Sequence, residues 1–367
     1  MTGRATSTSL LRPWAVVPPA GPVWFGAVMG TGILATLLRR ARAPTLLPAA
    51  LLVVGWVLVV GLVTTYALRL QRGETSLRES TVTIGDVTAW GLVSMGFLSV
   101  GSATLAVLGP QAVPVSLVLW VLGSALGSWT AVTFVARARR AGELPTFTWG
   151  LPVVPPMVTA TTGAGLSARL TGPTEWVVLS VSLAGFWLSI VAGGWIFARA
   201  YLRHLGDPLP LAASTSAWIP LGMVGQSTAA AQLLAEGVGR HLDEGSAGVV
   251  RTLAVDYGRF ALVLGIPLVL LAVLATIRGL ARRMPWSPGW WALTFPLGTL
   301  ALGAGKLGRA SASDALVSVG VALTLVLAGT WTFCAVTTVA VLRYRRGHEA
   351  AHLRRRTTYP SRSHVIS

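Results

Sequence analysis

Phe295 and Pro296 stand in the middle of an apolar stretch, WWALTFPLGTL, at residues 290–300. Proline has no N–H, and its ring clashes with the carbonyl group one turn back, so a helix must bend or break there. Within a membrane, the backbone groups freed by such a break need a neighbouring helix, water or a cavity. The sequence therefore places the ring of Phe295 where a pathway between helices could be narrowed or closed. The alternative is a kinked helix with Phe295 packed in its core.

Four other apolar stretches also contain helix-interrupting residues. A broken helix presents unpaired N–H groups and the positive end of its dipole, and both attract an anion without a formal charge. Hydroxyl groups nearby can donate hydrogen bonds to a solute, although they also bond readily to their own helix backbone. We therefore expect these positions to line a pore. With Phe295 as its gate, the candidates are Gly30, Thr31, Gly32, Ser94, Gly96, Pro155, Pro156, Pro220, Gly222, Pro296 and Gly298.

The residues on which most enzymes and metal sites depend are scarce. The 12 acidic residues lie in loops or near the ends of apolar stretches, and the five histidines lie in loops or in the C-terminal tail. A single cysteine, Cys334, excludes both a disulfide within the chain and a cysteine metal site. We expect no metal, no cofactor and no catalytic residue. Proton-coupled carriers usually need an ionisable group deep in the membrane, and only Asp86 or Glu79, at the mouth of a span, could serve.

The composition is that of an integral membrane protein. Hydrophobic residues make up 53% of the 367 residues and charged residues only 11%, whereas about a quarter of a soluble chain is charged. The net charge of +17 could suggest a nucleic-acid partner. The arginines, however, fall in short segments between apolar stretches, which is a topology signal. We therefore expect a lipid bilayer, and no nucleic acid, as partner.

We predict an all-α integral membrane fold with ten transmembrane helices. This domain covers residues 21–342, between a cytoplasmic N-terminal segment at 1–20 and a basic cytoplasmic tail at 343–367. About 20 apolar residues cross a bilayer. The predicted spans are 22–38, 47–70, 87–108, 113–135, 148–166, 176–198, 211–234, 260–277, 289–305 and 315–341.

Cationic residues orient these spans. Most of the 29 Lys and Arg fall in segments that share one side with the two termini. Because cytoplasmic loops carry an excess of Lys and Arg, both termini are expected to be cytoplasmic. The cluster of Arg39, Arg40 and Arg42 lies on the other side and is the main observation against this orientation.

The interruptions recur along the chain. Their centres, at Gly30, Ser94, Pro155, Pro220 and Pro296, are 61 to 76 residues apart, and all fall in odd-numbered spans. A hairpin of one interrupted inner helix and one straighter outer helix, repeated five times, fits this spacing.

Three motifs resemble one known family. GPVWFGAVMGTGILA at 21–35, IPLGMVGQSTAA at 219–230 and WWALTFPLG at 290–298 are similar to segments of the tellurite-resistance/dicarboxylate transporter family, in the slow-type and voltage-dependent anion channel superfamily. The resemblance implies five helical hairpins in a quasi-fivefold arrangement around a central pore, odd helices lining that pore, and often a homotrimer. It also implies a pore-blocking phenylalanine, for which Phe295 is the match.

We therefore interpret the chain as an anion channel or transporter of the inner (plasma) membrane, which moves small inorganic or organic anions past Phe295. A coupled exporter of a C4-dicarboxylate such as malate, of sulfite or of a tellurite-related oxyanion is the alternative. A membrane-embedded enzyme is a third interpretation, which the lack of clustered Asp, His and Glu disfavours.

Overall fold

The computed structural model describes residues 17–142 and 144–358, and in these ranges the chain forms helices and no strands. Within these ranges, seven helical segments are long and apolar enough to cross a membrane; α5, α7 and α9 are not among them. The α-helices are α1 (Phe25–Arg40), α2 (Leu46–Gln71), α3 (Ile84–Leu108), α4 (Val113–Ala141), α5 (Pro155–Ser167), α6 (Gly172–Gly206), α7 (Ile219–Gly239), α8 (Glu244–Ala281), α9 (Phe295–Ala310) and α10 (Asp314–Thr358).

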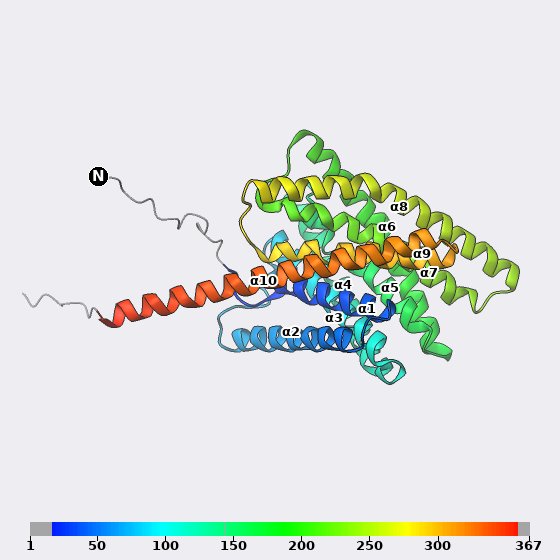
Figure 1. Ribbon diagram of the computed structural model, residues 1–367, viewed down its shortest axis with the longest axis horizontal. Coiled ribbons are helices and arrows are strands. Elements are labelled where there is room, and N and C mark those ends of the chain that lie inside the picture. The colour runs from blue at the N-terminus through cyan, green and yellow to red at the C-terminus, as the bar shows by residue number, and fades with distance from the viewer. Residues whose placement is uncertain (1–16, 143, 359–367) are drawn as a thin grey trace, which may run out of the picture.

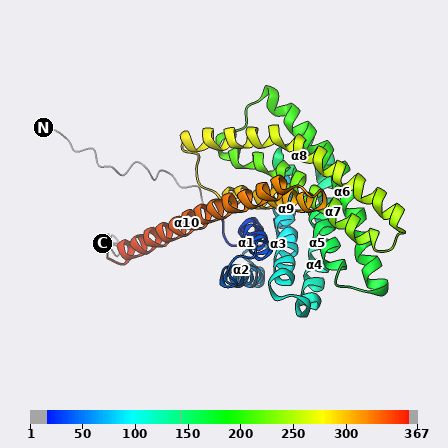
Figure 2. The same ribbon diagram turned by 45° about the vertical axis from the view of Figure 1, so that its right-hand side comes forward.

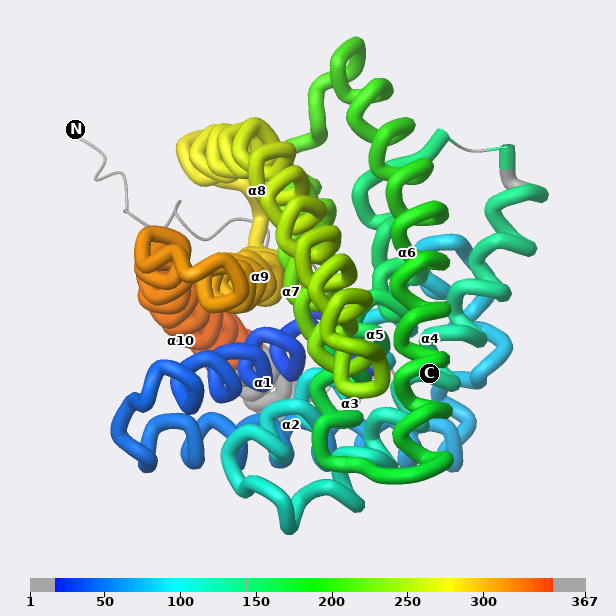
Figure 3. The backbone as a smooth tube through the Cα atoms, turned by 90° about the vertical axis from the view of Figure 1, so that its right-hand side faces the viewer, coloured from blue at the N-terminus to red at the C-terminus, as the bar shows by residue number. Residues whose placement is uncertain are grey.

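The odd-numbered helices lie inside and the even-numbered helices outside (Figures 1 and 3). Helix α1 packs against α3, α3 against α5, α5 against α7, α7 against α9, and α9 against α1, so the five inner helices close a ring. Each inner helix also packs against the even helix that follows it. Almost all large exposed apolar side chains belong to the even helices, which is what lipid-facing helices require.

Glycine allows the inner helices to approach closely. A Cβ atom on Gly225 of α7 would collide with the backbone of Thr299 and Leu300 in α9. A Cβ on Gly30 of α1 would collide with the side chain of Thr294, and one on Gly298 would lie 2.7 Å from Ile33. Such small residues are typical of helix contacts in membranes, where packing replaces the hydrophobic driving force.

Proline marks the start of three inner helices. Pro155, Pro220 and Pro296 lie in the first turn of α5, α7 and α9, where a missing N–H costs nothing. The 3-10 helices η5 (Phe147–Gly150), η6 (Leu211–Trp218) and η7 (Pro288–Leu293) lead into them. The fifth, seventh and ninth predicted spans are therefore each divided into a 3-10 segment and an α-helix, and the α-helix is short in the fifth and ninth.

The predicted interruptions in the first and third spans are wrong. Helix α1 is continuous through Gly30, Thr31 and Gly32, and α3 is continuous through Ser94 and Gly96. Glycine in a membrane helix can either weaken the helix or allow a neighbouring helix to approach closely. In α1 and α3 the glycines allow close approach.

Helix α10 is the longest element and extends beyond the bundle (Figures 1 and 2). The predicted boundary between the membrane domain and the tail, at residue 343, lies inside this helix. The parts of the predicted terminal segments at 1–16 and 359–367 lie outside the described residues.

Candidate functional site

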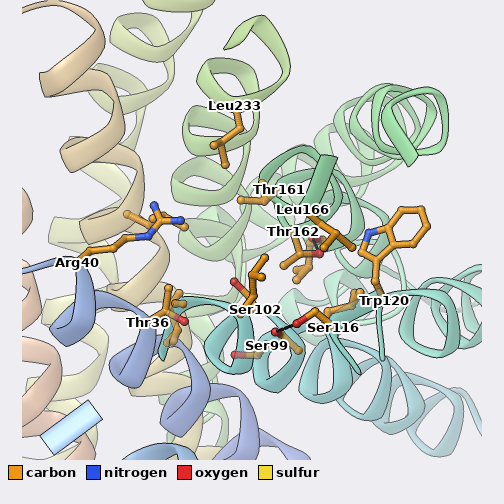
Figure 4. Close-up of a pocket in the computed structure, with 18 of the residues that line it drawn as sticks. Thr36, Arg40, Ser99, Ser102, Ser116, Trp120, Thr161, Thr162, Leu166 and Leu233 are labelled. Carbon is orange, nitrogen blue, oxygen red and sulfur yellow. Dashed lines mark hydrogen bonds between the residues drawn. The ribbon is translucent and has the colours of Figure 1, made fainter. Parts of the chain in front are cut away.

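A cavity of about 460 Å³ lies between the inner helices at the ends of α1 and α3 (Figure 4). All five inner helices and α4 contribute to it. We call it the basic cavity; its lining residues are Ile33, Thr36, Arg39, Arg40, Leu98, Ser99, Gly101, Ser102, Leu105, Ala106, Gly109, Ser116, Trp120, Val158, Thr161, Thr162, Gly165, Leu166, Arg169, Gln226, Leu233, Phe295 and Leu302.

Arginine side chains give this cavity its positive charge. Arg39 and Arg40 come from the end of α1, Arg169 follows α5, and no carboxylate is among the lining residues. Arg40 extends toward the hydroxyl-bearing side of the cavity in Figure 4. None of the three guanidinium groups has a hydrogen bond or an ion pair within the part of the chain that the structure describes. Their donors are therefore available to an anion.

A second set of charges stands close to Arg40. Lys306 of α9 is largely buried and pairs with Glu236 of α7, with Nζ 3.0 Å from Oε2. Arg40 interacts electrostatically with Arg309 and Glu236. Glu236 thus cancels part of the positive field at this end of the ring.

Most hydroxyl groups in the basic cavity donate to backbone carbonyls. Thr36 donates to Gly32 at 3.0 Å, and Ser99 donates to Met29 at 3.0 Å. Ser116, Thr161 and Thr162 also donate to backbone oxygens. Ser102 is the exception among the described hydroxyls that line the cavity, since its hydroxyl group neither donates nor accepts a hydrogen bond within the described residues. The hydroxyl groups therefore stabilise the helices more than they serve a solute.

A second cavity, of about 320 Å³, lies at the opposite ends of the same five helices and is lined by no charged side chain. We call it the apolar cavity; its lining residues are Val23, Gly26, Met29, Gly85, Thr88, Ala89, Leu92, Met95, Thr148, Leu151, Val154, Ile219, Gly222, Pro288, Gly289, Trp291, Ala292, Phe295 and Pro296.

Helix N-termini supply the positive potential that the apolar cavity otherwise lacks. Its lining includes Val154, the N-cap of α5, Ile219, the first residue of α7, and Phe295, the first residue of α9. Each N-terminus carries the equivalent of about half a positive charge. An anion is therefore attracted without a formal charge that would hold it.

Phe295 lines both cavities, so it lies at the constriction between them. Its side chain is 5% exposed. On each of the other inner helices, the last residue that lines the apolar cavity and the first residue that lines the basic cavity lie about one turn apart on the same face. These pairs are Met29 and Ile33, Met95 and Leu98, Val154 and Val158, and Gly222 and Gln226. The two cavities therefore follow one axis, and a collar of almost wholly apolar side chains separates them.

Gln226 is the polar member of that collar. It lines the basic cavity, its side chain is 3% exposed, and its Oε1 is buried without a donor among the described residues. Gln226 is not among the pore-lining residues predicted from the sequence. The signal that could have found it is its position four residues after Gly222, on the same face of α7.

Comparison with known proteins identifies the family of this chain. The model of the family described as "Voltage-dependent anion channel" matches residues 20–339. The chain belongs to this family. It is also 26% identical to sulfite efflux pump SSU1 of Arthroderma otae over 352 residues, which cover 89% of this chain and 92% of that protein. The SSU1 proteins of Trichophyton rubrum and Arthroderma benhamiae are 26% identical over 351 residues, with the same coverage.

The chain is therefore a membrane protein of a voltage-dependent anion channel family that moves anions, and the resemblance found from its motifs is confirmed. Both the family and the similar proteins are channels or transporters, which supports the expectation that this chain is not an enzyme.

The structure brings three of the sequence-selected residues to the cavities, namely Phe295, Pro296 and Gly222. Most of the remaining candidates contact neighbouring helices. Ser94 donates to the carbonyl of Gly123 at 2.7 Å, and Thr31 accepts a hydrogen bond from Trp331 at 2.9 Å. Six further candidates, which line neither cavity, are Gly30, Gly32, Gly96, Pro155, Pro220 and Gly298. The last candidate, Pro156, lines a separate recess beside α4 and α6.

The charges beside the basic cavity are expected to control the anion flux. Arg40→Gln is expected to lower anion flux at low ionic strength by roughly threefold to tenfold, because the field that concentrates anions weakens. Glu236→Gln is expected to raise flux, since it removes the neutralising carboxylate. Flux in liposomes at low and high salt is the measurement.

Arg282→Gln, at the far end of the outer helix α8, is the matched control and should leave flux unchanged. The effects of Arg40→Gln and Glu236→Gln should shrink in high salt, because screening shortens the reach of the field. Equal effects at both salt concentrations would contradict the electrostatic role.

Proposed function

We propose that this chain exports sulfite or a similar small oxyanion across the plasma membrane, along the axis from the apolar cavity past Phe295 to the basic cavity. The observation that carries the proposal is the position of Phe295 between two cavities lined by the same five helices. The similarity to sulfite efflux pumps favours sulfite among the oxyanions.

The proposed pathway requires all ten helices to cross the membrane as five hairpins in a quasi-fivefold arrangement. The closed ring of inner helices, each packed against the even helix that follows it, supports this. Helices α5 and α9 are too short to cross as α-helices alone. With η5 and η7 in front of them, they cover residues 147–167 and 288–310. The family resemblance adds a homotrimer, for which the mass of the protein in detergent, by light scattering, is the test.

The same proposal gives the pathway a mechanism. An anion gives up part of its hydration in the apolar cavity, where three helix N-termini compensate for the lost water. The ring of Phe295 then turns away from the axis. The anion finally meets Arg40 and Arg169 and regains water in the basic cavity. Phe295 acts as a steric and dehydrating barrier. Passage of the anion past this barrier requires no change in the protonation state of any residue.

In the proposed orientation both termini are cytoplasmic, and the apolar cavity opens to the cytoplasm. Arg39 and Arg40 then lie on the outside, where they line the exit for an exported anion. This accounts for the cationic cluster that opposed the orientation in the sequence. A reporter fused after Arg140 should be cytoplasmic, and one fused after Gly172 should be external. A cytoplasmic reporter after Gly172 would contradict the orientation.

A panel of anions tests the substrate. Purified protein in liposomes should carry sulfite, and the panel should include malate, nitrate, chloride and tellurite. Reversal potentials at two pH values separate a passive pathway from proton-coupled export, because coupling shifts the potential with pH. Transport of malate without sulfite would replace the proposed substrate with a C4-dicarboxylate. No flux of any anion would contradict the proposed function.

Removal of the ring tests the gate. Phe295→Ala is expected to raise anion flux per folded protein, because the widest side chain of the collar is lost. If Phe295 were only a core residue, the truncation would instead cost roughly 3 to 5 kcal/mol of stability and lower both yield and flux. Anion flux in liposomes, together with the thermal unfolding of the detergent-solubilised protein, distinguishes the two.

Phe333→Ala is the matched control. Phe333 stacks on Trp290, with ring centroids 5.5 Å apart, on the outer helix α10. It lines neither the basic nor the apolar cavity. Its truncation should leave flux per folded protein unchanged. An unchanged or lower flux in Phe295→Ala would remove the gate.

A further inference from the structure

Gln226 is the polar residue in an otherwise apolar layer of the pathway. At the level where it enters the basic cavity, the other inner helices contribute Ile33, Leu98, Val158 and Phe295. All four are 5% exposed or less. A glutamine here is unexpected, because an apolar residue would complete the collar without burying an amide group.

The side-chain amide of Gln226 has no hydrogen-bond partner among the residues that the structure describes. None of the hydrogen bonds among the described residues involves Nε2 or Oε1, and Oε1 is buried. The nearby hydroxyl of Thr161 does not donate to this amide. It donates to two backbone carbonyl oxygens, those of Met157 at 3.0 Å and of Gln226 at 3.2 Å. A buried carbonyl oxygen without a donor is costly, so a donor from the pathway would stabilise this site.

A second buried glutamine on α7, Gln232, has a hydrogen-bond partner and serves a structural role. It lies on α7, is 2% exposed, and donates from Nε2 to the carbonyl of Ala254 in α8 at 2.6 Å. Gln232 lines neither cavity. The two glutamines on one helix therefore differ in what they contact, and only Gln226 is left for a solute.

We propose that Gln226 selects an oxyanion that still carries a proton, such as hydrogen sulfite. The amide offers one donor and one acceptor whichever way its oxygen and nitrogen are assigned. Nε2 donates to a charged oxygen of the solute, and Oε1 accepts the hydrogen bond from the protonated oxygen. Nitrate and chloride carry no proton, so they leave the carbonyl unpaired. This inference rests on the proposed anion transport and specifies the form of the anion that passes.

The charge of the solute agrees with this selection. The collar contains no charged side chain, so a monoanion loses less hydration energy there than a dianion does. Retaining a proton lowers the charge of sulfite by one, and the same proton satisfies Oε1. A single uncharged residue can therefore discriminate both between protonation states and between kinds of anion.

The test compares fluxes in liposomes at a mildly acidic pH, where hydrogen sulfite predominates. Gln226→Leu removes both polar groups with little change in volume. The ratio of sulfite flux to nitrate flux is expected to fall about tenfold, the factor expected from losing one or two hydrogen bonds. Nitrate flux should stay the same or rise. Gln226→Met, which keeps the unbranched side chain, provides the same measurement if the leucine variant does not fold.

Gln232→Leu is the matched control. It should lower the unfolding temperature, because Ala254 loses its donor, but it should preserve the flux ratio. Equal loss of sulfite and nitrate flux in Gln226→Leu, or an unchanged ratio, would overturn the selection by Gln226 while leaving anion transport intact. An absence of anion flux in the unaltered protein would overturn the transport proposal together with this inference.

Discussion

The close approach of the five inner helices is the constraint on which the pathway depends. Gly225 lets α7 meet the backbone of α9, and Gly91 lets α3 meet the carbonyl of Leu151 in front of α5. These contacts leave no room for a Cβ atom. Because the ring is so narrow, a single phenylalanine can fill its axis. A wider ring would need several side chains to close it, and no one residue would act as a gate.

Proline made part of this site predictable from the sequence. Proline is tolerated in the first turn of an α-helix and disfavours a helix that runs into it, so Pro155, Pro220 and Pro296 correctly marked where α5, α7 and α9 begin. Pro267, which lies inside the continuous helix α8, shows that the rule has exceptions. The ring beside Pro296 consequently lay at a helix start, between two cavities. Hydropathy likewise predicted a helical membrane fold, since the apolar outer helices carry that signal most clearly.

Glycine and hydroxyl residues were less informative, for a physical reason. Gly30, Gly32 and Gly96 stand in continuous helices, where they admit a neighbour instead of breaking the backbone. Which face of a helix meets the axis depends on tertiary packing, which periodicity does not specify in a helix that is apolar all round. Gln226 was missed for this reason, because its importance arises from four apolar neighbours on other helices.

The two cavities attract anions by different means, and the difference suits transport. The basic cavity has formal charges at the end of the ring, whereas the apolar cavity has only helix N-termini. A fixed cation at the collar would bind an anion tightly and slow its departure. An apolar collar avoids that binding but imposes a dehydration barrier. Gln226 lowers this barrier only for a solute that can both accept and donate, so the group that eases passage is also the group that selects. The arginines can then be placed beyond the collar, where water reaches them and release is rapid.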